Sequence, residues 1–328
     1  MSRRSNLWAV VLAAGDGTRL ACLTQDPDGY AVPKQFCSLD GGEALVQEAL
    51  QRARQIAPSD QVSVIVARQH SHYWRHVLCD VPACNIIVQP HNRGTAHGIL
   101  LSVLSILERD PLARVMFLPA DHYVLDEPSL ELALRELSLH LKRNPDGLVL
   151  VGIEPDEPDP ELGYIVAGYT LSDGSRRVAQ FVEKPPAALA TRLYETGALW
   201  NSFIFGSAAN WLLGLLRTHL GVTVEHMATA LARELQHGDS SLTRLYENLR
   251  PVDFSRSVIQ QAPQALRVVT APACGWNDLG TPRRVADTLR RLAEIRRPIY
   301  GLPVAARGAP QAGLINLATQ HARMTLAG

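Results

Sequence analysis

The chain has 328 residues, of which 46% are hydrophobic and 20% charged, so it can bury a large core as a globular protein. Its 32 basic and 32 acidic residues cancel, which argues against a partner recognised mainly by charge, such as nucleic acid or an anionic membrane. The five cysteines form no Cys-x-x-Cys pair, and their odd number favours reduced thiols in a cytoplasmic protein. No apolar stretch approaches the roughly 20 residues that a membrane span requires.

The first predicted element is a buried strand over residues 7–14, followed by the turn Gly15-Asp16-Gly17-Thr18-Arg19-Leu20. The strand imitates the apolar part of a signal peptide, but it leads directly into the turn, so we interpret it as structure. Glycines let the turn approach a ligand and present N–H groups to phosphate oxygens, whose charge Arg19 and Lys34 could neutralise. Leu20 occupies the position of the third glycine of a dinucleotide fingerprint, and no P-loop sequence occurs, so neither motif explains the turn.

Apolar strands alternate with amphipathic helices along the next part of the chain. The strands are predicted over residues 62–66, 85–88, 114–118 and 148–151, and the helices over residues 43–57, 95–109 and 129–143. This alternation predicts an α/β fold with a doubly wound, mostly parallel sheet. Ligands of such sheets bind beyond the carboxyl ends of the strands, so the first turn and Asp121 should face one crevice.

The second half of the chain has a different pattern. Its predicted elements are a proline-rich acidic connection over 154–160, short antiparallel strands over 164–169 and 177–182, helices within 207–250 and a last basic helix over 281–297. We therefore expect one domain over residues 1–297, made of the parts 1–153 and 154–297. A tail over residues 298–328 has no predicted structure.

Two aspartates are candidate ligands of a metal ion. Asp121 lies in Leu118-Pro119-Ala120-Asp121-His122, and Asp278 lies in Gly275-Trp276-Asn277-Asp278-Leu279-Gly280. A lone aspartate after a strand is usually a helix cap or a solvated turn residue. A nucleoside triphosphate site, however, requires a carboxylate that holds Mg²⁺ against the phosphates, and Mg²⁺ commonly takes one or two protein carboxylates. The two aspartates together meet that requirement.

Three further stretches combine polar or small residues with apolar ones and contain candidate binding residues. They are Leu162-Gly163-Tyr164-Ile165, Phe181-Val182-Glu183-Lys184-Pro185 and Trp200-Asn201-Ser202-Phe203-Ile204-Phe205. An acidic–basic pair at a strand end, such as Glu183 and Lys184, is most often a solvated surface feature. These stretches therefore gain meaning only in combination with the motifs before them.

Together the motifs resemble those of the sugar-1-phosphate nucleotidyltransferases, in family order from about residue 7 to about residue 291. The mannose-1-phosphate guanylyltransferase (GDP-mannose pyrophosphorylase) branch is the most similar. The resemblance implies a Rossmann-like fold with a nucleotide-binding part over 1–153 and a smaller sugar-phosphate-binding part over 154–297. It implies catalytic roles for Arg19, Lys34, Asp121 and Lys184, and Mg²⁺ binding by Asp121 and Asp278. The nucleotide-binding residues that it implies are Leu12, Ala13, Gly15, Gly17, Thr18, Gln89, Gly94 and Thr95, and the sugar-phosphate-binding residues are Gly163, Glu183, Lys184 and Asn201.

Two positions depart from this branch. Its base-recognition loop begins with Glu-Pro, whereas this chain reads Gln89-Pro90-His91-Asn92-Arg93-Gly94-Thr95-Ala96. A glutamine side chain offers one acceptor and one donor, which suits N3–H and O4 of thymine or uracil and equally N1–H and O6 of guanine. Phe203 stands where the branch has a glycine, so we expect the backbone to approach the sugar differently.

We therefore expect a Mg²⁺-dependent transfer of a nucleotidyl group from a nucleoside triphosphate, with GTP favoured, to a sugar 1-phosphate, with mannose 1-phosphate favoured. One alternative is the same chemistry with dTTP or UTP and glucose 1-phosphate. Another is a non-catalytic homologue that binds a nucleotide sugar and regulates a partner, although the chain keeps the cations and carboxylates that such a homologue could lose. Neither nucleic acid nor a membrane is an expected partner, and the tail after Pro298 could pack against a second copy in a homodimer.

Overall fold

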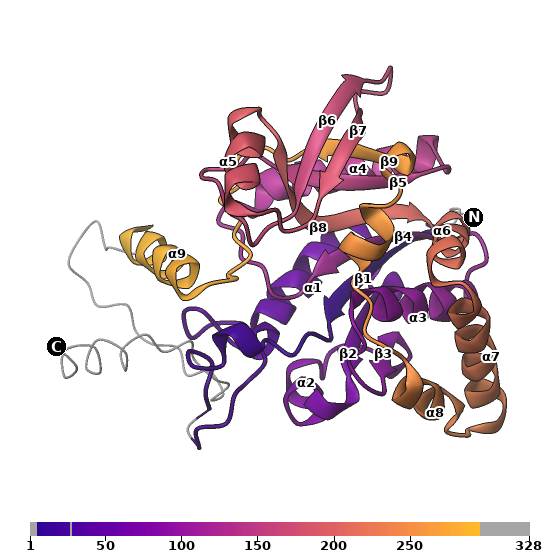
Figure 1. Cartoon of the computed structure of the whole chain (residues 1–328). Helices are drawn as coiled ribbons and strands as arrows, with labels where there is room; N and C mark the ends of the chain where they lie inside the picture. The colour runs from indigo at the N-terminus through magenta and orange to yellow at the C-terminus, as the bar shows by residue number, and fades with distance from the viewer. Residues whose placement is uncertain (1–4, 27, 296–328) are drawn as a thin grey trace.

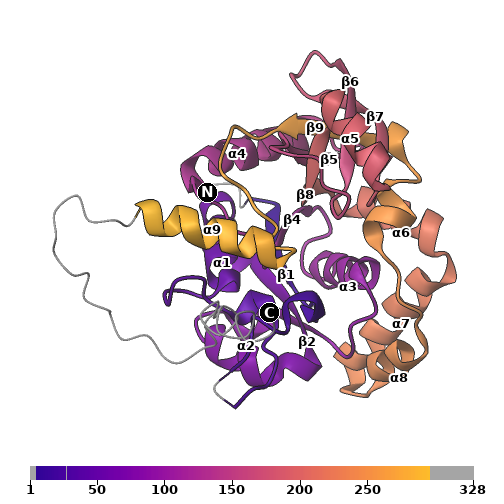
Figure 2. The same ribbon diagram turned by 60° about the vertical axis from the view of Figure 1, so that its left-hand side comes forward.

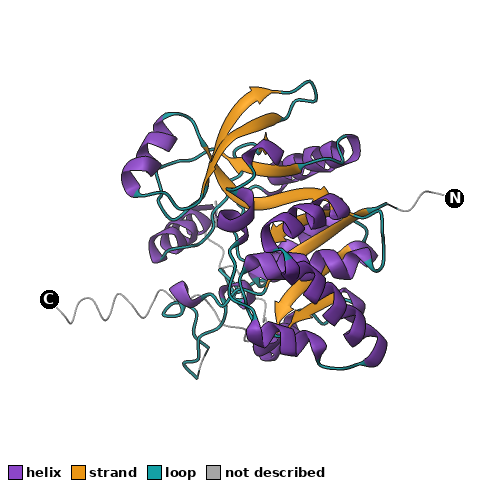
Figure 3. Cartoon of the chain, turned by 45° about the vertical axis from the view of Figure 1, so that its right-hand side comes forward, coloured by secondary structure: helices purple, strands orange, loops and turns teal. Residues whose placement is uncertain are grey.

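The computed structural model describes residues 5–26 and 28–295. Its strands are β1 (Leu7–Ala13), β2 (Val62–Ala67), β3 (Ile86–Gln89), β4 (Arg114–Pro119), β5 (Leu148–Ile153), β6 (Tyr164–Thr170), β7 (Arg176–Val182), β8 (Leu199–Ala208) and β9 (Leu266–Thr270). Its helices are α1 (Leu45–Ile56), α2 (Ser71–Val77), α3 (Thr95–Leu107), α4 (Glu127–Arg143), α5 (Ala187–Glu195), α6 (Ala209–Leu220), α7 (Val222–His237), α8 (Ser241–Asn248) and α9 (Pro282–Ile295). The strands run through the middle of the molecule between the helices (Figure 3).

The strands form one sheet in the order β3-β2-β1-β4-β8-β5-β9-β7-β6. The first four strands in this order pair in parallel, as the alternating pattern of strands and helices predicts. β8 runs antiparallel between β4 and β5, and β6 and β7 form an antiparallel ribbon at the end of the sheet (top of Figure 1). The predicted α/β class, with a mixed sheet flanked by helices, is confirmed. The sheet is less parallel than expected, because β6, β7 and β8 pair antiparallel with their neighbours.

Four of these elements, α2, α5, β8 and β9, have no counterpart among the elements predicted from the sequence. β8 is buried on both faces over most of its length, so its residues do not alternate between apolar and polar in the way that marks a half-buried strand. It also begins at Leu199, directly before Trp200-Asn201-Ser202, and ends at Ala208, inside the region predicted to be helical. Its insertion means that the part after residue 154 contributes a strand to the centre of the same sheet.

Helices cover both faces of the sheet and create two hydrophobic cores. Successive residues of β1 point to opposite faces, so Val11 packs into the core beneath α1 and α4, and Val10 packs into the core beneath α3 and α6. α7 and α8 extend the second face (lower right in Figure 1). Because the cores hold the strands in fixed register, the loops at the strand ends also have fixed positions.

The last predicted helix is confirmed over α9, which lies at the outer edge of the molecule in Figure 1 and comes forward in Figure 2. Residues 296–297 of that prediction and the tail over 298–328 lie outside the described residues. Within the described part of the chain, no helix combines the length and apolar character needed to cross a bilayer.

Candidate active site

The first turn closes over the segment that carries Lys34. Gly17 adopts a left-handed conformation with φ of 63°, and a Cβ there would lie 2.9 Å from the backbone nitrogen of Lys34. The side-chain amide of Gln35 donates to the carbonyls of Ala13 (3.0 Å) and Gly15 (2.8 Å). Glycine is therefore required at position 17 for the approach of the two segments, and β1 ends in a turn tied to the loop after it.

A cavity of about 170 Å³ lies at this place. It is lined by Gly17, Thr18, Arg19, Leu20, Lys34, Asp121, Leu279 and Gly280. The expectation that the first turn and Asp121 face one crevice is therefore met, and the turn around Asp278 joins them. The remaining predicted nucleotide-binding residues of this region are close by in the chain, since Leu12 and Ala13 end β1 and Gly15 begins the turn.

Lys34 connects the two predicted metal-binding aspartates. Its Nζ lies 3.0 Å from Oδ2 of Asp121, and it donates to the backbone carbonyls of Asp278 (2.6 Å) and Leu279 (3.3 Å). An ammonium group has three N–H donors, so these three acceptors match its full capacity. The side chain is 8% exposed. Lys34 thus organises the carboxylate turns, besides placing a positive charge at the cavity.

Asp121 is held in its charged form. Burial alone would raise the pKa of its carboxyl, but the charges of Lys34 and His122 and the hydrogen bond from Lys34 lower it below the ordinary value. Burial lowers the pKa of His122, whose ring stands edge-on to Trp276 with 5.1 Å between the ring centroids. Near pH 7 an anionic Asp121 therefore lines the cavity, and the neighbouring His122 is neutral.

A pair of backbone hydrogen bonds brings the two aspartate turns together. The amide of Tyr123 donates to the carbonyl of Asn277 (2.8 Å), and the amide of Asn277 donates to the carbonyl of Tyr123 (2.9 Å). Within residues 5–26 and 28–295, no three His, Cys, Asp or Glu side chains gather as a metal site. Two carboxylates suit Mg²⁺, which commonly completes its shell with substrate phosphates and water. The residues present therefore fit the predicted ion.

Arg19 pairs with a residue next to the predicted sugar-binding segment. Its Nη1 bonds Oε2 of Glu161 at 3.1 Å, and both side chains are about half exposed. Glu161 lies two residues before Gly163 in the chain. An exposed pair of this kind is weak, on the order of 0–1 kcal/mol, so a triphosphate in the cavity can draw Arg19 away from Glu161.

The predicted base loop is packed against a distant segment. Gly94 has φ of 84°, and a Cβ there would lie 2.3 Å from the carbonyl oxygen of Val252. Oγ1 of Thr95 accepts a hydrogen bond from the amide of Phe254 (2.8 Å). Gln89 is 1% exposed, and its Oε1 has no hydrogen-bond partner among the described residues. The predicted base loop therefore begins with a buried amide acceptor that has no partner among the described side chains and backbone groups.

Asp16 joins the base loop to the first turn, a role that the sequence patterns did not reveal. Its carboxylate accepts from Nδ2 of Asn92 (2.9 Å) and from Nε2 of Gln69 (2.8 Å), and it lies 3.4 Å from Nε2 of His70. The signal for this role was its position between the two glycines of the turn. Asp16 thus links the first turn directly to Asn92 of the predicted base loop.

Three predicted sugar-side residues also meet. A Cβ on Gly163 would lie 2.7 Å from Oε2 of Glu183 and 3.4 Å from Cβ of Asn201, and the amide of Asn201 donates to the Gly163 carbonyl (2.8 Å). Burial and the charge of Asp253 raise the pKa of Glu183 to about 7, against the lowering effect of Lys184. The amide of Glu183 donates to Oε1 of Gln260 (2.8 Å). Asp253 lies in Pro251-Val252-Asp253-Phe254-Ser255, which resembles a Ser-x-Asp segment of the mannose-1-phosphate guanylyltransferase branch, but neither Asp253 nor Gln260 was among the predicted site residues.

Two residues beside this cluster have left-handed backbones. Lys184 is exposed with φ of 47°, and Phe203 has φ of 57°. Phe203 therefore keeps a conformation that favours glycine, and its amide donates to Oδ1 of Asn201 (3.1 Å). Its ring packs edge-on against Phe205 and Phe254. Phe203 thus fills space next to Asn201 while its backbone is left-handed, and its effect on the approach to the sugar stays a prediction.

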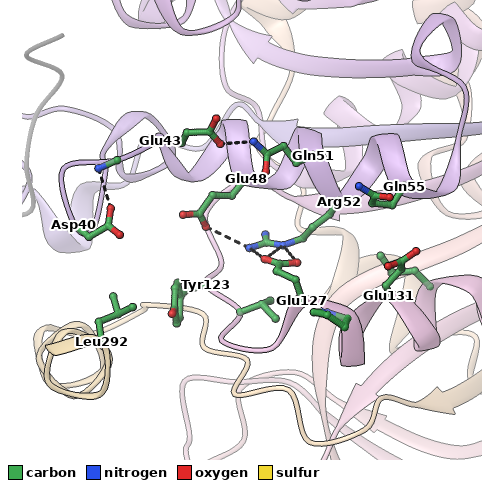
Figure 4. A pocket seen from close by; sticks show the side chains of 14 residues that line it. Asp40, Glu43, Glu48, Gln51, Arg52, Gln55, Tyr123, Glu127, Glu131 and Leu292 are labelled. Atoms are coloured by element: carbon green, nitrogen blue, oxygen red, sulfur yellow. Dashed lines mark hydrogen bonds and ion pairs between the residues drawn. The ribbon is translucent and has the colours of Figure 1, made fainter. Parts of the chain in front are cut away.

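A second, larger cavity of about 550 Å³ lies between α1, α4 and α9 (Figure 4). In its centre the buried Arg52 bonds both carboxylate oxygens of Glu127 (2.8 and 2.9 Å), and its Nη2 lies 3.4 Å from Glu48. Burial raises the pKa of Glu48 to about 7, against the lowering effect of Arg52. None of the predicted site residues lines this cavity, so we assign the active site to the smaller one.

Comparison with known proteins identifies the family of this chain. The family model described as nucleotidyl transferase matches residues 8–294. The alginate biosynthesis protein AlgA of Pseudomonas syringae pv. tomato is 29% identical over 83% of this chain and 56% of its own length. A mannose-1-phosphate guanylyltransferase of Salmonella montevideo is 28% identical over 83% of this chain and 58% of its own length. The chain therefore spans little more than half the length of these relatives.

A solved structure shows the same fold. It is described as a mannose-1-phosphate geranyltransferase from Thermus thermophilus, and it matches with a TM-score of 0.71 and 30% identity over 84% of this chain and 77% of that one. The family match covers nearly every element that places a predicted site residue. The chain belongs to the nucleotidyl transferase family.

Proposed function

We propose that this chain transfers a nucleotidyl group from GTP to mannose 1-phosphate and releases pyrophosphate. The observation that supports this most is the position of two sites next to each other. One is the cavity with Lys34 and Asp121, and the other is the cluster of Gly163, Glu183 and Asn201. The ion pair between Arg19 and Glu161 connects them. A triphosphate and a sugar phosphate need such adjacent places in order to react.

The reaction requires no general base. The phosphate of a sugar 1-phosphate is already an anion, so its oxygen can attack the α-phosphorus in line while pyrophosphate leaves. Arg19 leaves Glu161 and neutralises the triphosphate, and Lys184 places the attacking phosphate. Lys34 keeps the Asp121 carboxylate in position, and it also holds the turn that carries Asp278. Mg²⁺ held by these two aspartates would neutralise charge on the phosphates.

The sugar hydroxyls are assigned to the second cluster. The Glu183 carboxylate and the Asn201 amide lie around Gly163, whose lack of a side chain leaves room for a sugar beside its backbone. The relatives named as mannose-1-phosphate enzymes support mannose as the sugar. Other hexose 1-phosphates present similar hydroxyl groups and are the competing substrates in the test below.

The base of the triphosphate is assigned from the relatives and from the chemistry of Gln89. The relatives support guanine, whereas Gln89, with one amide donor and one acceptor, can pair equally with thymine or uracil. dTTP or UTP with glucose 1-phosphate is therefore the second candidate pair. Within the described residues, the unpaired Oε1 of Gln89 is the observation that keeps this candidate open.

A matrix of nucleoside triphosphates against sugar 1-phosphates, measured by pyrophosphate release, tests the proposal. GTP with mannose 1-phosphate should give the highest kcat/KM, and Asp121→Asn and Lys184→Ala should each lower it. Near-full activity of both variants would contradict the assigned roles. Binding of a nucleotide sugar without pyrophosphate release for any pair would indicate the non-catalytic alternative.

We also propose a reducing compartment and a homodimer for this chain. The five cysteines are all unpaired, which favours a reducing compartment such as the cytoplasm. Self-association as a homodimer is a prediction from the sequence, and light scattering coupled to size-exclusion chromatography measures it directly.

A further inference from the structure

α9 brings a buried cation to the turn that carries Asp278. The side chain of Arg284 is 6% exposed, and its guanidinium lies 4.7 Å from the centroid of the Trp200 ring. Its Nε donates to Oδ2 of Asp159 (2.9 Å), and Nη2 lies 2.7 Å from the same oxygen. Its Nη1 lies 3.6 Å from Oδ1 of Asp278. One residue of the last helix thus contacts three separate parts of the fold.

The distance between Arg284 and Asp278 is short enough for electrostatic attraction but too long for a direct hydrogen bond. Oδ1 of Asp278 accepts its hydrogen bond from the Gly280 amide instead (3.1 Å). A Cβ on Gly280 would lie 2.2 Å from Oδ2, so the carboxylate is folded tightly over its own turn. Because Asp159 engages two nitrogens of Arg284, the guanidinium is prevented from closing fully on Asp278.

We propose that Arg284 is a positioning residue for Asp278, holding its carboxylate in the orientation that binds a divalent cation. This inference rests on the proposed function, in which Asp278 is a metal ligand. Arg284 also ties that ligand to the sugar side, because Asp159 precedes Gly163 by a short segment and Trp200 directly precedes Asn201. Partners of metal ligands of this kind typically change metal affinity by about 10–100-fold when they are removed.

The neighbouring residue provides a matched control. Arg283 is on the same helix and carries the same charge, but its guanidinium pairs with Glu157 and is 63% exposed. It does not line the cavity with Lys34 and Asp121. Replacing Arg283 therefore removes one positive charge from α9 without touching the Asp278 turn.

The test is a titration of the full-length chain with Mn²⁺ in the presence of an unreactive GTP analogue, followed by electron paramagnetic resonance. We expect Arg284→Met to raise the Kd for Mn²⁺ about tenfold or more and Arg283→Met to leave it within about twofold of wild type. Arg284→Lys keeps the charge but loses the planar fork, so its Kd should lie between these values. Thermal unfolding measured in parallel separates a change in Mn²⁺ binding from a loss of stability.

The variant Asp278→Asn tests whether Asp278 is itself a ligand of the metal ion. If Asp278→Asn binds Mn²⁺ as wild type does, Asp278 is not a ligand, and both the metal part of the proposed function and this inference are wrong. If Asp278→Asn weakens binding while Arg284→Met does not, only the role of Arg284 is wrong. Should Arg284→Met fail to fold, Asp159→Asn replaces it, since it frees the guanidinium while keeping its charge. Unchanged Mn²⁺ binding by Asp159→Asn would equally overturn the inference.

Discussion

Lys34 and Asp121 meet as an ion pair of 3.0 Å, although one lies in the loop after the first turn and the other follows β4. The same ammonium group bonds the backbone of Asp278 and Leu279. One side chain thus joins three loops that come from widely separated parts of the chain. The pair lies at the carboxyl ends of parallel strands, where open α/β sheets bind their ligands.

Replacement of Lys34 should therefore damage catalysis more than its charge alone suggests. We expect Lys34→Met to lower kcat for pyrophosphate release by about 10²–10³, as for the loss of one preorganised charge in an active site. The variant loses the ammonium group that we propose contacts the phosphates, and the same group anchors the turns that carry Asp121 and Asp278. Lys142→Met, at an exposed position of α4, is the control and should keep wild-type kcat. Equal activity of the two variants would show that Lys34 has no role in the reaction.

Gly163→Ala should affect the sugar side alone. The new Cβ would lie 2.7 Å from Oε2 of Glu183, so the carboxylate must move. We expect the KM for the sugar 1-phosphate to rise about tenfold, as for the loss of one charged hydrogen-bonding group, with the KM for the triphosphate unchanged. Gly214→Ala in α6, where a Cβ would meet no atom within 4 Å, is the matched control. A rise in both KM values for Gly163→Ala would argue against separate sugar and triphosphate sites.

The titration of Glu183 predicts a pH dependence for sugar binding. Its pKa is raised to about 7, so the carboxylate becomes ionised near neutral pH. An ionised carboxylate accepts hydrogen bonds from hydroxyl groups more strongly, so the KM for the sugar 1-phosphate should fall from about pH 6 to about pH 8. Glu183→Gln keeps the titration of the substrate phosphate but removes that of the carboxyl. The difference between the two KM profiles isolates Glu183, and parallel profiles would exclude its ionisation from binding.

Glu48 predicts a pH dependence of stability at the larger cavity. Its pKa is raised from 4.5 to about 7, so the folded chain binds this proton more tightly than the unfolded chain does. The stability that protonation contributes is complete below the unfolded pKa and is lost as the pH rises through about 7. Glu48→Gln removes the cost of a buried charge and should stabilise the chain by about 1–3 kcal/mol at about pH 8, with little gain at about pH 5.

Chemical denaturation at the two pH values measures this effect. Glu43→Gln, at an exposed position on the rim of the same cavity, is the control and should show no such difference between the two pH values. A Glu48→Gln gain that is the same at both pH values would mean that the buried charge is not its cause.

The sequence by itself determined the strands and helices whose residues repeat with a local period. β1, β2, β3 and β4, together with α1 and α3, follow from apolar runs and amphipathic spacing. The candidate site residues could be named because Gly17, Asp121 and Glu183 lie at strand ends within recognisable motifs. Their assigned roles in substrate and metal binding are still predictions.

Only the tertiary structure decided which distant residues support the candidate site residues. β8 was not predicted as a strand, and its insertion between β4 and β5 places Asn201 beside Gly163. Asp16 contacts Asn92 and Arg284 contacts Asp159, both far away in the chain, and no local pattern encodes those contacts. The physical reason is that periodicity reports which face of an element is buried, whereas the meeting of two loops depends on how all the elements pack together.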